Sequence, residues 1–526
     1  MTLAEPSMQP YRWRDWWWAL PMLFFLSAGL GGARLFDVDE GAFSEATREM
    51  LSSGDWGHTT LNGRDRFDKP IGVYWLQAFS MALLGPTELA VRLPSALATW
   101  GACLALAAFV RPRGGAQAAL IAAVVHVTSL GPWIMAHAAT ADALLGLWLM
   151  LAALDLWRYL EQPQQAVLCR LAVWCGLGFL TKGPVALLLP GAVLVICVAQ
   201  ERRWGLWRGL LNWRPWAVFS AVAMPWFIYA FERHGIAFWQ GFFLRHNIER
   251  FTAPLEGHGG GWLYFAVVTP LLWLPWTPLL GVAWLQRRRL ALDASVRWSL
   301  VWVGFVLVFF SLSGTKLPHY AIYAAPGMAL LLTHACRHAT AVHWHVCLGV
   351  LLAWHGLMLA LPHLLQAGHW LPNNAEYASL LQQGPKPVSW LPVLGLWSMA
   401  VFAVGHCRRR LDGWFVGGAT MVAALVHGLV LAWGVLPWWS GALQGQVYRL
   451  ALQARSWPGT VVQAQGHWPS FAFYLQKATP LRYPETGELA LLSRKSLREH
   501  PGWVVVHQDL TLVLATPDAA DKQAGQ

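Results

Sequence analysis

The chain has 526 residues, of which 56% are hydrophobic and only 12% are charged, and it contains 35 tryptophans. A soluble globular domain carries about 25% charged residues, so this composition excludes a soluble enzyme and indicates a protein that crosses a membrane many times. The net charge of +11 does not indicate nucleic-acid binding, because the basic residues form small clusters between apolar runs, where membrane topology signals occur.

Apolar runs of about 20 residues, the length that a spanning helix needs, follow one another along the chain. They predict about thirteen spans, at approximately residues 16–34, 88–110, 116–134, 140–157, 166–181, 184–200, 211–231, 262–284, 297–313, 320–335, 343–362, 389–406 and 413–437. Arg12 and Arg14 precede the first run, so the positive-inside rule places the N-terminus in the cytoplasm. Every second connection after that is basic, which assigns the other connections to the outer side of the membrane.

Two short helices are expected along the outer membrane surface. In the first, at about residues 42–54, Phe43 lies with other apolar residues on one face and Glu45 with polar residues on the opposite face. This pattern is typical of an interfacial amphipathic helix. The second covers about residues 69–85, where Pro70 in the first turn suits the start of a helix.

Hydropathy falls near the C-terminus. Residues 440–526 alternate short runs of β type with helical ones, which predicts a small α/β domain. An odd number of spans places this domain on the outer side, and residues 1–439 then form the transmembrane domain. The predicted fold class is a polytopic α-helical membrane protein with interfacial helices and a small C-terminal α/β domain.

Two carboxylates at the outer side are candidate catalytic groups. Helix capping explains one aspartate after the first span, but not the cluster of Asp37, Asp39 and Glu40. A carboxylate at the mouth of a membrane cavity can act as a general base, and Asp39 is the candidate for this role. Asp142 begins an apolar run, where an ionisable group is costly. It could pair with a cation, orient the partner of Asp39, or bind an acceptor amine.

Basic residues also occur on the outer side, where the positive-inside rule predicts few. They are Lys69, Lys182, Arg245, Arg250 and Lys316, and Tyr74, Tyr320 and Tyr323 occur in the same connections. A lone lysine or arginine commonly extends toward lipid head groups. Several of them together with tyrosine hydroxyls suit an anionic head group such as a phosphate.

Two features bear on cofactors, nucleotide-binding motifs and metal ligands, and the sequence contains only candidates for the second. The sequence has no Walker motif and no GxGxxG on a βαβ unit, which argues against a nucleotide-sugar donor and favours a substrate that enters from the membrane. Potential metal ligands on the outer side are His58, Asp68, His137, His246, His258 and His319. No pair has a recognised zinc spacing such as HExxH, so scattered interfacial histidines are expected, with Asp68 as the leading candidate ligand.

The motifs DVDEGAFSEATREMLSSGDW, FDKPIGVYW, LTKGP, HNIERF and KLPHYAIYAAP together resemble polyprenyl-phosphate-dependent membrane glycosyltransferases. These enzymes are related to the protein O-mannosyltransferases, and the closest resemblance is to the lipid A aminoarabinose transferase (ArnT-like) family, of GT-C type. The resemblance covers essentially the whole chain. It implies an inner-membrane enzyme that transfers a monosaccharide from undecaprenyl phosphate to a periplasmic acceptor, with lipid A phosphate as the expected acceptor, by an inverting displacement.

The resemblance also implies roles for particular residues. The family's catalytic acid falls on Asp39 and a second acid of the outer connections on Asp142. Its residues that hold the lipid phosphate fall on Lys69, Arg250 and Tyr320, with Tyr74 nearby. The family's metal-linked acid falls on Asp68, where this chain has aspartate in place of the usual glutamate, and it implies a divalent metal ion.

Two alternatives remain open. The first is the same chemistry on a protein or another glycan acceptor. The second is a transporter or flippase of polyprenyl-linked sugars. A transporter would place broken helices and polar residues near the bilayer midplane, whereas the polar clusters of this chain occur at the outer surface.

Overall fold

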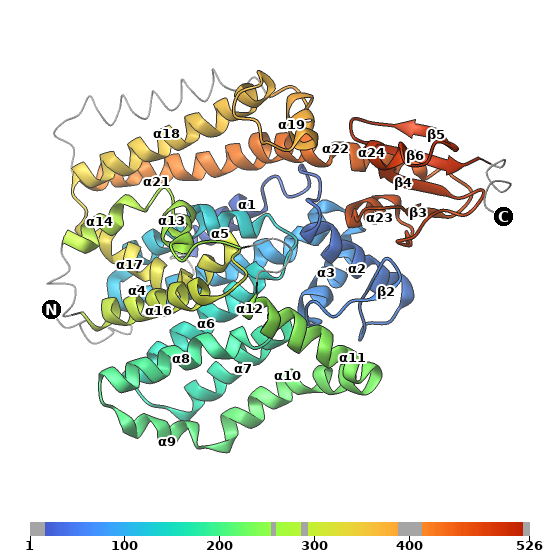
Figure 1. The fold of residues 1–526 in the computed structure, drawn as a ribbon. Helices are drawn as coiled ribbons and strands as arrows, with labels where there is room; N and C mark the ends of the chain where they lie inside the picture. Colours follow the sequence, from blue (N-terminus) through green and yellow to red (C-terminus); the bar gives the residue numbers. More distant parts are fainter. Residues whose placement is uncertain (1–15, 254–258, 286–292, 388–412, 519–526) are drawn as a thin grey trace.

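The computed structural model describes residues 16–253, 259–285, 293–387 and 413–518. Figure 1 shows a bundle of helices with two short helices, a β-hairpin and a small sheet gathered at one end. The bundle contains α1 (Ala19–Ser27), α4 (Glu88–Thr128), α5 (Leu130–Ala136), α6 (Asp142–Glu161), α7 (Gln165–Lys182), α8 (Val185–Gln200), α10 (Trp213–His234), α13 (Tyr264–Leu272), α14 (Pro278–Leu285), α16 (Ala294–Leu312), α17 (Ala325–His338), α18 (Ala341–Gln366), α21 (Gly413–Val430) and α22 (Leu436–Ala454).

Shorter segments join these helices. They are η2 (Trp204–Leu206), α9 (Trp207–Leu210), α11 (Ile236–Phe238), the π-helix η3 (Trp239–Glu249), α12 (Arg250–Thr252), the 3₁₀ helix η4 (Pro318–Ala324), α19 (Ala375–Gln382) and the π-helix η5 (Leu431–Val435).

Five helical stretches of the described chain are long and apolar enough to cross a membrane. They are Glu88–Thr128, Asp142–Glu161, Ala294–Leu312, Ala341–Gln366 and Val416–Ala454. The chain is therefore a multi-pass helical membrane protein, while the count of thirteen spans stays a prediction. The predicted span at 389–406 lies outside the described residues.

The predicted spans at 88–110 and 116–134 share one long element. Helix α4 covers the first and most of the second, with a kink at Gly115, whose φ of +82° and ψ of 174° only glycine adopts readily, and α5 forms the end of the second. Pro112 lies just before the kink and removes a backbone donor. The two spans are thus two helices that meet without a connecting loop.

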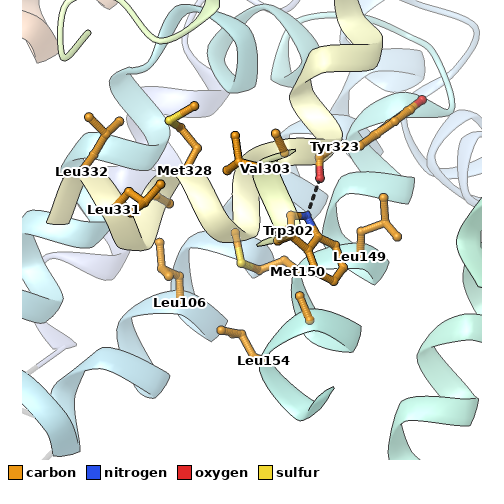
Figure 2. Packing of buried hydrophobic residues seen from close by; sticks show 14 of the residues in the cluster. Leu106, Leu149, Met150, Leu154, Trp302, Val303, Tyr323, Met328, Leu331 and Leu332 are labelled. Atoms are coloured by element: carbon orange, nitrogen blue, oxygen red, sulfur yellow. Dashed lines mark hydrogen bonds between the residues drawn. The ribbon is translucent and has the colours of Figure 1, made fainter. Parts of the chain in front are cut away.

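A core of large apolar side chains fixes the centre of the bundle (Figure 2). Leu106 of α4, Met150 of α6, Trp302 of α16 and Met328 of α17 belong to this core. The indole N–H of Trp302 donates a hydrogen bond of 2.9 Å to the backbone oxygen of Tyr323. The core therefore anchors η4, the segment that carries Tyr323 toward the outer connections.

The first predicted surface helix corresponds to α2 (Asp39–Ser53), which begins three residues earlier than expected. Its polar face does not lie in water: Ser44 and Glu45 are 0% exposed. The Arg48 guanidinium donates to both oxygens of Glu45, at 2.6 and 2.7 Å, and helix α23 of the C-terminal region packs against α2. The position of α2 along the membrane surface stays a prediction. Sequence periodicity did not reveal that its polar face is covered by protein.

The second predicted surface helix corresponds to α3 (Gly72–Leu84). Between α2 and α3 the chain forms an antiparallel hairpin of β1 (Thr60–Leu61) and β2 (Arg64–Asp65). The backbone N–H of Arg66 donates to Thr59 at 2.9 Å, and the Thr59 hydroxyl donates to the backbone of Arg66 at 3.0 Å. These bonds fix the base of the hairpin, directly before Asp68 and Lys69.

The C-terminal region contains a four-stranded sheet with strand order β3-β4-β6-β5. Its elements are β3 (Val461–Gln463), α23 (Pro469–Leu475), β4 (Leu489–Ser493), α24 (Arg494–Leu497), β5 (Trp503–Gln508) and β6 (Leu512–Pro517). Strands β3 and β4 are parallel, and the other pairs are antiparallel. Helix α22 runs without a break across residue 440, so the sheet follows the last bundle helix directly.

Candidate active site

Side chains from distant segments of the chain line a cavity of about 500 Å³. The polar part of its lining is Asp68, Lys69, Lys182, His246, Asn247, Arg250, Thr252, Ser313, Tyr320 and Tyr323. A cavity of this size and mixed lining is typical of a small-molecule site. Its lysines and arginine favour an anionic ligand.

The remaining wall of the cavity is apolar. It is formed by Pro184, Val185, Leu188, Trp239, Phe243, Ile248, Phe251, Phe309 and Phe310. These residues come from the start of α8, from η3 and α12, and from the end of α16. A ligand with a charged head and a hydrocarbon tail would bury both parts in this cavity.

Asp142 holds two of the polar side chains in place. Its Oδ1 accepts hydrogen bonds from Lys182 Nζ at 2.5 Å and from the Tyr323 hydroxyl at 2.5 Å. The Lys182 ammonium also donates to the Tyr323 hydroxyl at 2.6 Å. His319 Nε2 lies 3.7 Å from the same carboxylate oxygen. Of the three roles that the sequence left open for Asp142, pairing with a cation is the one seen.

Lys69 and Asp68 follow the hairpin and face the other cations. The Lys69 ammonium donates to the backbone oxygen of Asp68 at 3.0 Å. Burial, together with the positive charges of Lys182, Arg250 and Arg66, lowers the pKa of Lys69 to about 8. Burial alone would raise the pKa of Asp68, but its bond to His246 and the nearby cations lower it.

Asp39 lies at the first turn of α2 and is exposed. Within the part of the chain that the structure describes, its carboxylate has no hydrogen-bond or ion-pair partner. Its negative charge acts on both Arg66 and His319, and His319 in turn neighbours Asp142. Asp39 is thus an available carboxylate within electrostatic range of residues that border the cavity.

The other acids of the same cluster are already engaged. Asp37 accepts hydrogen bonds from the backbone N–H of Ser470 at 2.9 Å and from its hydroxyl at 2.5 Å. Glu40 is buried and accepts from the Arg92 guanidinium at 2.7 and 2.8 Å and from the backbone N–H of Ala139 at 2.7 Å. These two acids hold the loop in place and leave Asp39 free for chemistry.

Some predicted ligands lie outside the cavity lining. Tyr74 is fully buried, and its hydroxyl accepts a hydrogen bond of 3.1 Å from Arg66 Nε. Lys316 is buried and donates to the backbone oxygen of Ser313 at 2.6 Å. Arg245 is exposed on η3. By contrast, four of the predicted phosphate ligands line the cavity together: Lys69, Lys182, Arg250 and Tyr320. That they bind a lipid phosphate stays a prediction.

The sequence did not single out Arg66, and it named His319 only as a possible metal ligand and Tyr323 only as one of the tyrosines near the cations. Tyr323 follows Tyr320 by three residues, which in a 3₁₀ helix places both on one face. This spacing could have predicted that Tyr323 belongs to the same site as Tyr320. Arg66 was not recognisable, because its contacts to Asp68 and Tyr74 depend on how the hairpin folds back.

The residues around Asp68 do not fit a metal site. Arg66 Nη2 lies 3.0 Å from Asp68 Oδ2, and His246 Nε2 lies 2.8 Å from Asp68 Oδ1. The Arg66 guanidinium thus occupies one side of the Asp68 carboxylate, and its positive charge would repel a metal ion there. In the described residues, the group with three metal-binding side chains within reach of one another is His58, Asp65 and His234.

Fold and cavity together define a multi-pass membrane protein with a cavity that has cationic side chains beside an apolar wall. Residues 68–229 match the family of dolichyl-phosphate-mannose-protein mannosyltransferases. The chain is 32% identical over 330 residues to the undecaprenyl phosphate-alpha-4-amino-4-deoxy-L-arabinose arabinosyl transferase of Aeromonas hydrophila. That match covers 60% of this chain and 59% of the relative, so the chain spans less than two thirds of its length.

A longer match is found to the protein of the same name from Edwardsiella ictaluri, with 28% identity, 95% of this chain and 94% of the relative covered. The crystal structure of ArnT from Cupriavidus metallidurans bound to undecaprenyl phosphate has a TM-score of 0.81 to this chain at 22% identity, with 95% of this chain and 97% of ArnT covered. The apo structure of the same protein gives a TM-score of 0.80.

The chain is therefore similar to these membrane sugar transferases, and it shares the helical fold of ArnT. This confirms the family resemblance drawn from the sequence motifs.

Proposed function

We propose that this protein is an integral membrane glycosyltransferase that transfers a monosaccharide from an undecaprenyl phosphate carrier to a periplasmic acceptor. The observation that carries the proposal is the convergence of Lys69, Lys182 and Arg250 in one cavity with an apolar wall. The curated relatives are named as undecaprenyl phosphate-4-amino-4-deoxy-L-arabinose arabinosyl transferases, which supports this sugar and this carrier. Lipid A phosphate as the acceptor rests on the resemblance of the sequence motifs.

The donor's two chemical parts match the two parts of the cavity. Its phosphate would accept hydrogen bonds from the cations, which compensate the charge when it is released. Its isoprenoid chain would lie against residues such as Leu188 and Phe309, which belong to the apolar wall of the cavity. The donor then never has to leave the membrane.

The chemical step is a single displacement. The acceptor oxygen attacks the anomeric carbon while its proton passes to the Asp39 carboxylate. The bond between the anomeric carbon and the phosphate oxygen breaks, and its electron pair stays on undecaprenyl phosphate. Because that leaving group is already an anion stabilised by the lysines and Arg250, no general acid is needed. The configuration at the anomeric carbon is inverted.

Asp142 has a positioning role in this mechanism. Its carboxylate neutralises Lys182 and fixes the Tyr323 hydroxyl, so both face the cavity in a defined orientation. A carboxylate that already accepts hydrogen bonds from a lysine and a tyrosine is a weaker base than a carboxylate without partners. The proton transfer is therefore assigned to Asp39 alone.

The catalytic side is assigned to the periplasm. Lys69, Lys182 and Arg250 belong to connections that the positive-inside rule assigns to the outer side of the membrane.

Replacement of Asp39 tests the function. We expect Asp39→Asn to bind undecaprenyl phosphate normally and to lose nearly all sugar transfer, because the amide cannot accept the acceptor's proton. The measurement is mass analysis of lipid A and of released undecaprenyl phosphate with protein reconstituted in liposomes. Glu376→Gln, an exposed acid on α19 without a side-chain partner in the described residues, is the matched control. Normal turnover in Asp39→Asn would refute the assignment.

The same assay separates the alternatives. If the acceptor is a protein or another glycan, that molecule would receive the sugar in place of lipid A. A transporter or flippase would move the lipid-linked sugar across liposomes without an acceptor and would leave the sugar–phosphate bond intact.

A further inference from the structure

A second group of polar side chains lies beside the hairpin, outside the residues that line the cavity. His58 follows α2, Asp65 ends β2, and His234 is the last residue of α10. His58 Nε2 lies 3.1 Å from Asp65 Oδ1, and His234 Nδ1 lies 3.5 Å from Asp65 Oδ2. We propose that these three residues bind one divalent transition-metal ion of the zinc class, which joins the hairpin to the end of α10.

The geometry suits such an ion. Imidazole nitrogen and carboxylate oxygen are the donors that zinc takes in proteins, at about 2.0–2.1 Å. Two ligands of a tetrahedral ion are then separated by about 3.3 Å, which lies between the two distances present here. The histidine side chains are 12% exposed each and that of Asp65 is 53% exposed, so a water molecule can complete the coordination from the solvent side.

The local charges permit a cation. Arg233 is adjacent, but it pairs with Asp55 at 2.5 Å and donates to the Tyr229 hydroxyl at 2.6 Å, so its charge is already compensated. Asp65 supplies a negative charge to the ion itself.

The position of the group indicates what the ion does. The ring of Phe67 packs edge-on against His234, with centroids 5.1 Å apart. Phe67 directly precedes Asp68 and Lys69. An ion held by His58, Asp65 and His234 would fix both sides of this contact and so hold the segment that enters the cavity. It is a structural ion and takes no part in bond making or breaking.

The test uses the full-length protein in detergent, stripped of metal with a chelator and titrated with Co²⁺ as a spectroscopic probe. We expect one Co²⁺ per chain, with visible absorption bands of a four-coordinate ion, and displacement by one equivalent of Zn²⁺. His58→Ala and His234→Ala should abolish the bands. His246→Gln, which alters the histidine next to Asp68, should retain them.

Folding of each variant is checked by its thermal melting. Zn²⁺ should raise the melting temperature of the unchanged protein and of His246→Gln, but not of His58→Ala. If the histidine variants do not fold, Asp65→Asn provides the same test, because this half-exposed side chain can be changed without altering the packing. Absence of the bands in the unchanged protein, their persistence in Asp65→Asn, or their loss in His246→Gln would overturn the proposal.

Discussion

At the scale of single residues, Lys69 differs from the other cations of the cavity. It is half-buried and faces Lys182, Arg250 and Arg66, with Asp68 as the opposing charge. Burial and the neighbouring cations lower its pKa to about 8, whereas an arginine stays charged throughout the accessible pH range.

Donor binding should therefore depend on pH. Below its pKa Lys69 is charged and can bind the phosphate; above it the ammonium loses its proton and the attraction is lost. We expect the affinity for undecaprenyl phosphate to fall about tenfold as pH rises through about 8. Lys69→Arg should flatten this dependence, as measured by binding titrations at several pH values. An equal pH dependence in both proteins would contradict the assignment.

The pair of Asp142 and Lys182 gives a second prediction at this scale. Removal of one partner of a buried ion pair costs about 3–5 kcal/mol, because the other charge remains buried. Asp142→Asn should therefore lower the melting temperature clearly and weaken donor binding. Arg449→Gln, which breaks a more exposed pair with Asp509, should change stability by less than about 1 kcal/mol. If Asp142→Asn and Arg449→Gln lowered the melting temperature equally, the larger contribution of the Asp142–Lys182 pair to stability would be contradicted.

At the scale of elements, helix α23 of the C-terminal region fastens the segment that leads into α2. Ser470 binds Asp37, and the Tyr474 hydroxyl accepts a hydrogen bond of 2.8 Å from the backbone N–H of Leu35. Gly41 lies against both Asp37 and Ser470 and leaves no room for a side chain. The C-terminal region thus supports the turn that presents Asp39.

Loss of this support should affect the reaction more than donor binding. Ser470→Ala removes one of the two hydrogen bonds to Asp37 and loosens the turn that holds Asp39, but it leaves the cavity unchanged. We expect a reduction of about tenfold in turnover with an unchanged affinity for undecaprenyl phosphate. Ser456→Ala, an exposed serine in the same region, serves as the control. A change in donor affinity without a change in turnover would contradict this role.

The elements also show what sequence patterns predict and where they stop. Lys69, Arg250 and Tyr320 were predictable because each stands in a connection on the same side of the membrane. Arg245 belongs to the same connection as Arg250, but it is exposed on the π-helix η3. Which side of such a helix meets the cavity depends on tertiary packing, and so does the burial of the polar face of α2.

At the scale of the whole molecule, the site exists only when the bundle is assembled. Lys69, Lys182, Arg250 and Tyr320 come from four regions of the sequence, and no two of them share a helix. The core of Trp302 and its neighbours fixes η4, while the hairpin and α23 fix the segments that carry Lys69 and Asp39 (Figures 1 and 2). The central claim is that these regions together form one binding site for a lipid phosphate.

A structure of the full-length protein with undecaprenyl phosphate bound tests this claim most directly. We expect the phosphate within hydrogen-bond distance of Lys69, Lys182 and Arg250, the first isoprenoid units against Leu188 and Phe309, and Asp39 facing the phosphate from the solvent side. A phosphate bound elsewhere, with the cavity empty, would contradict the account.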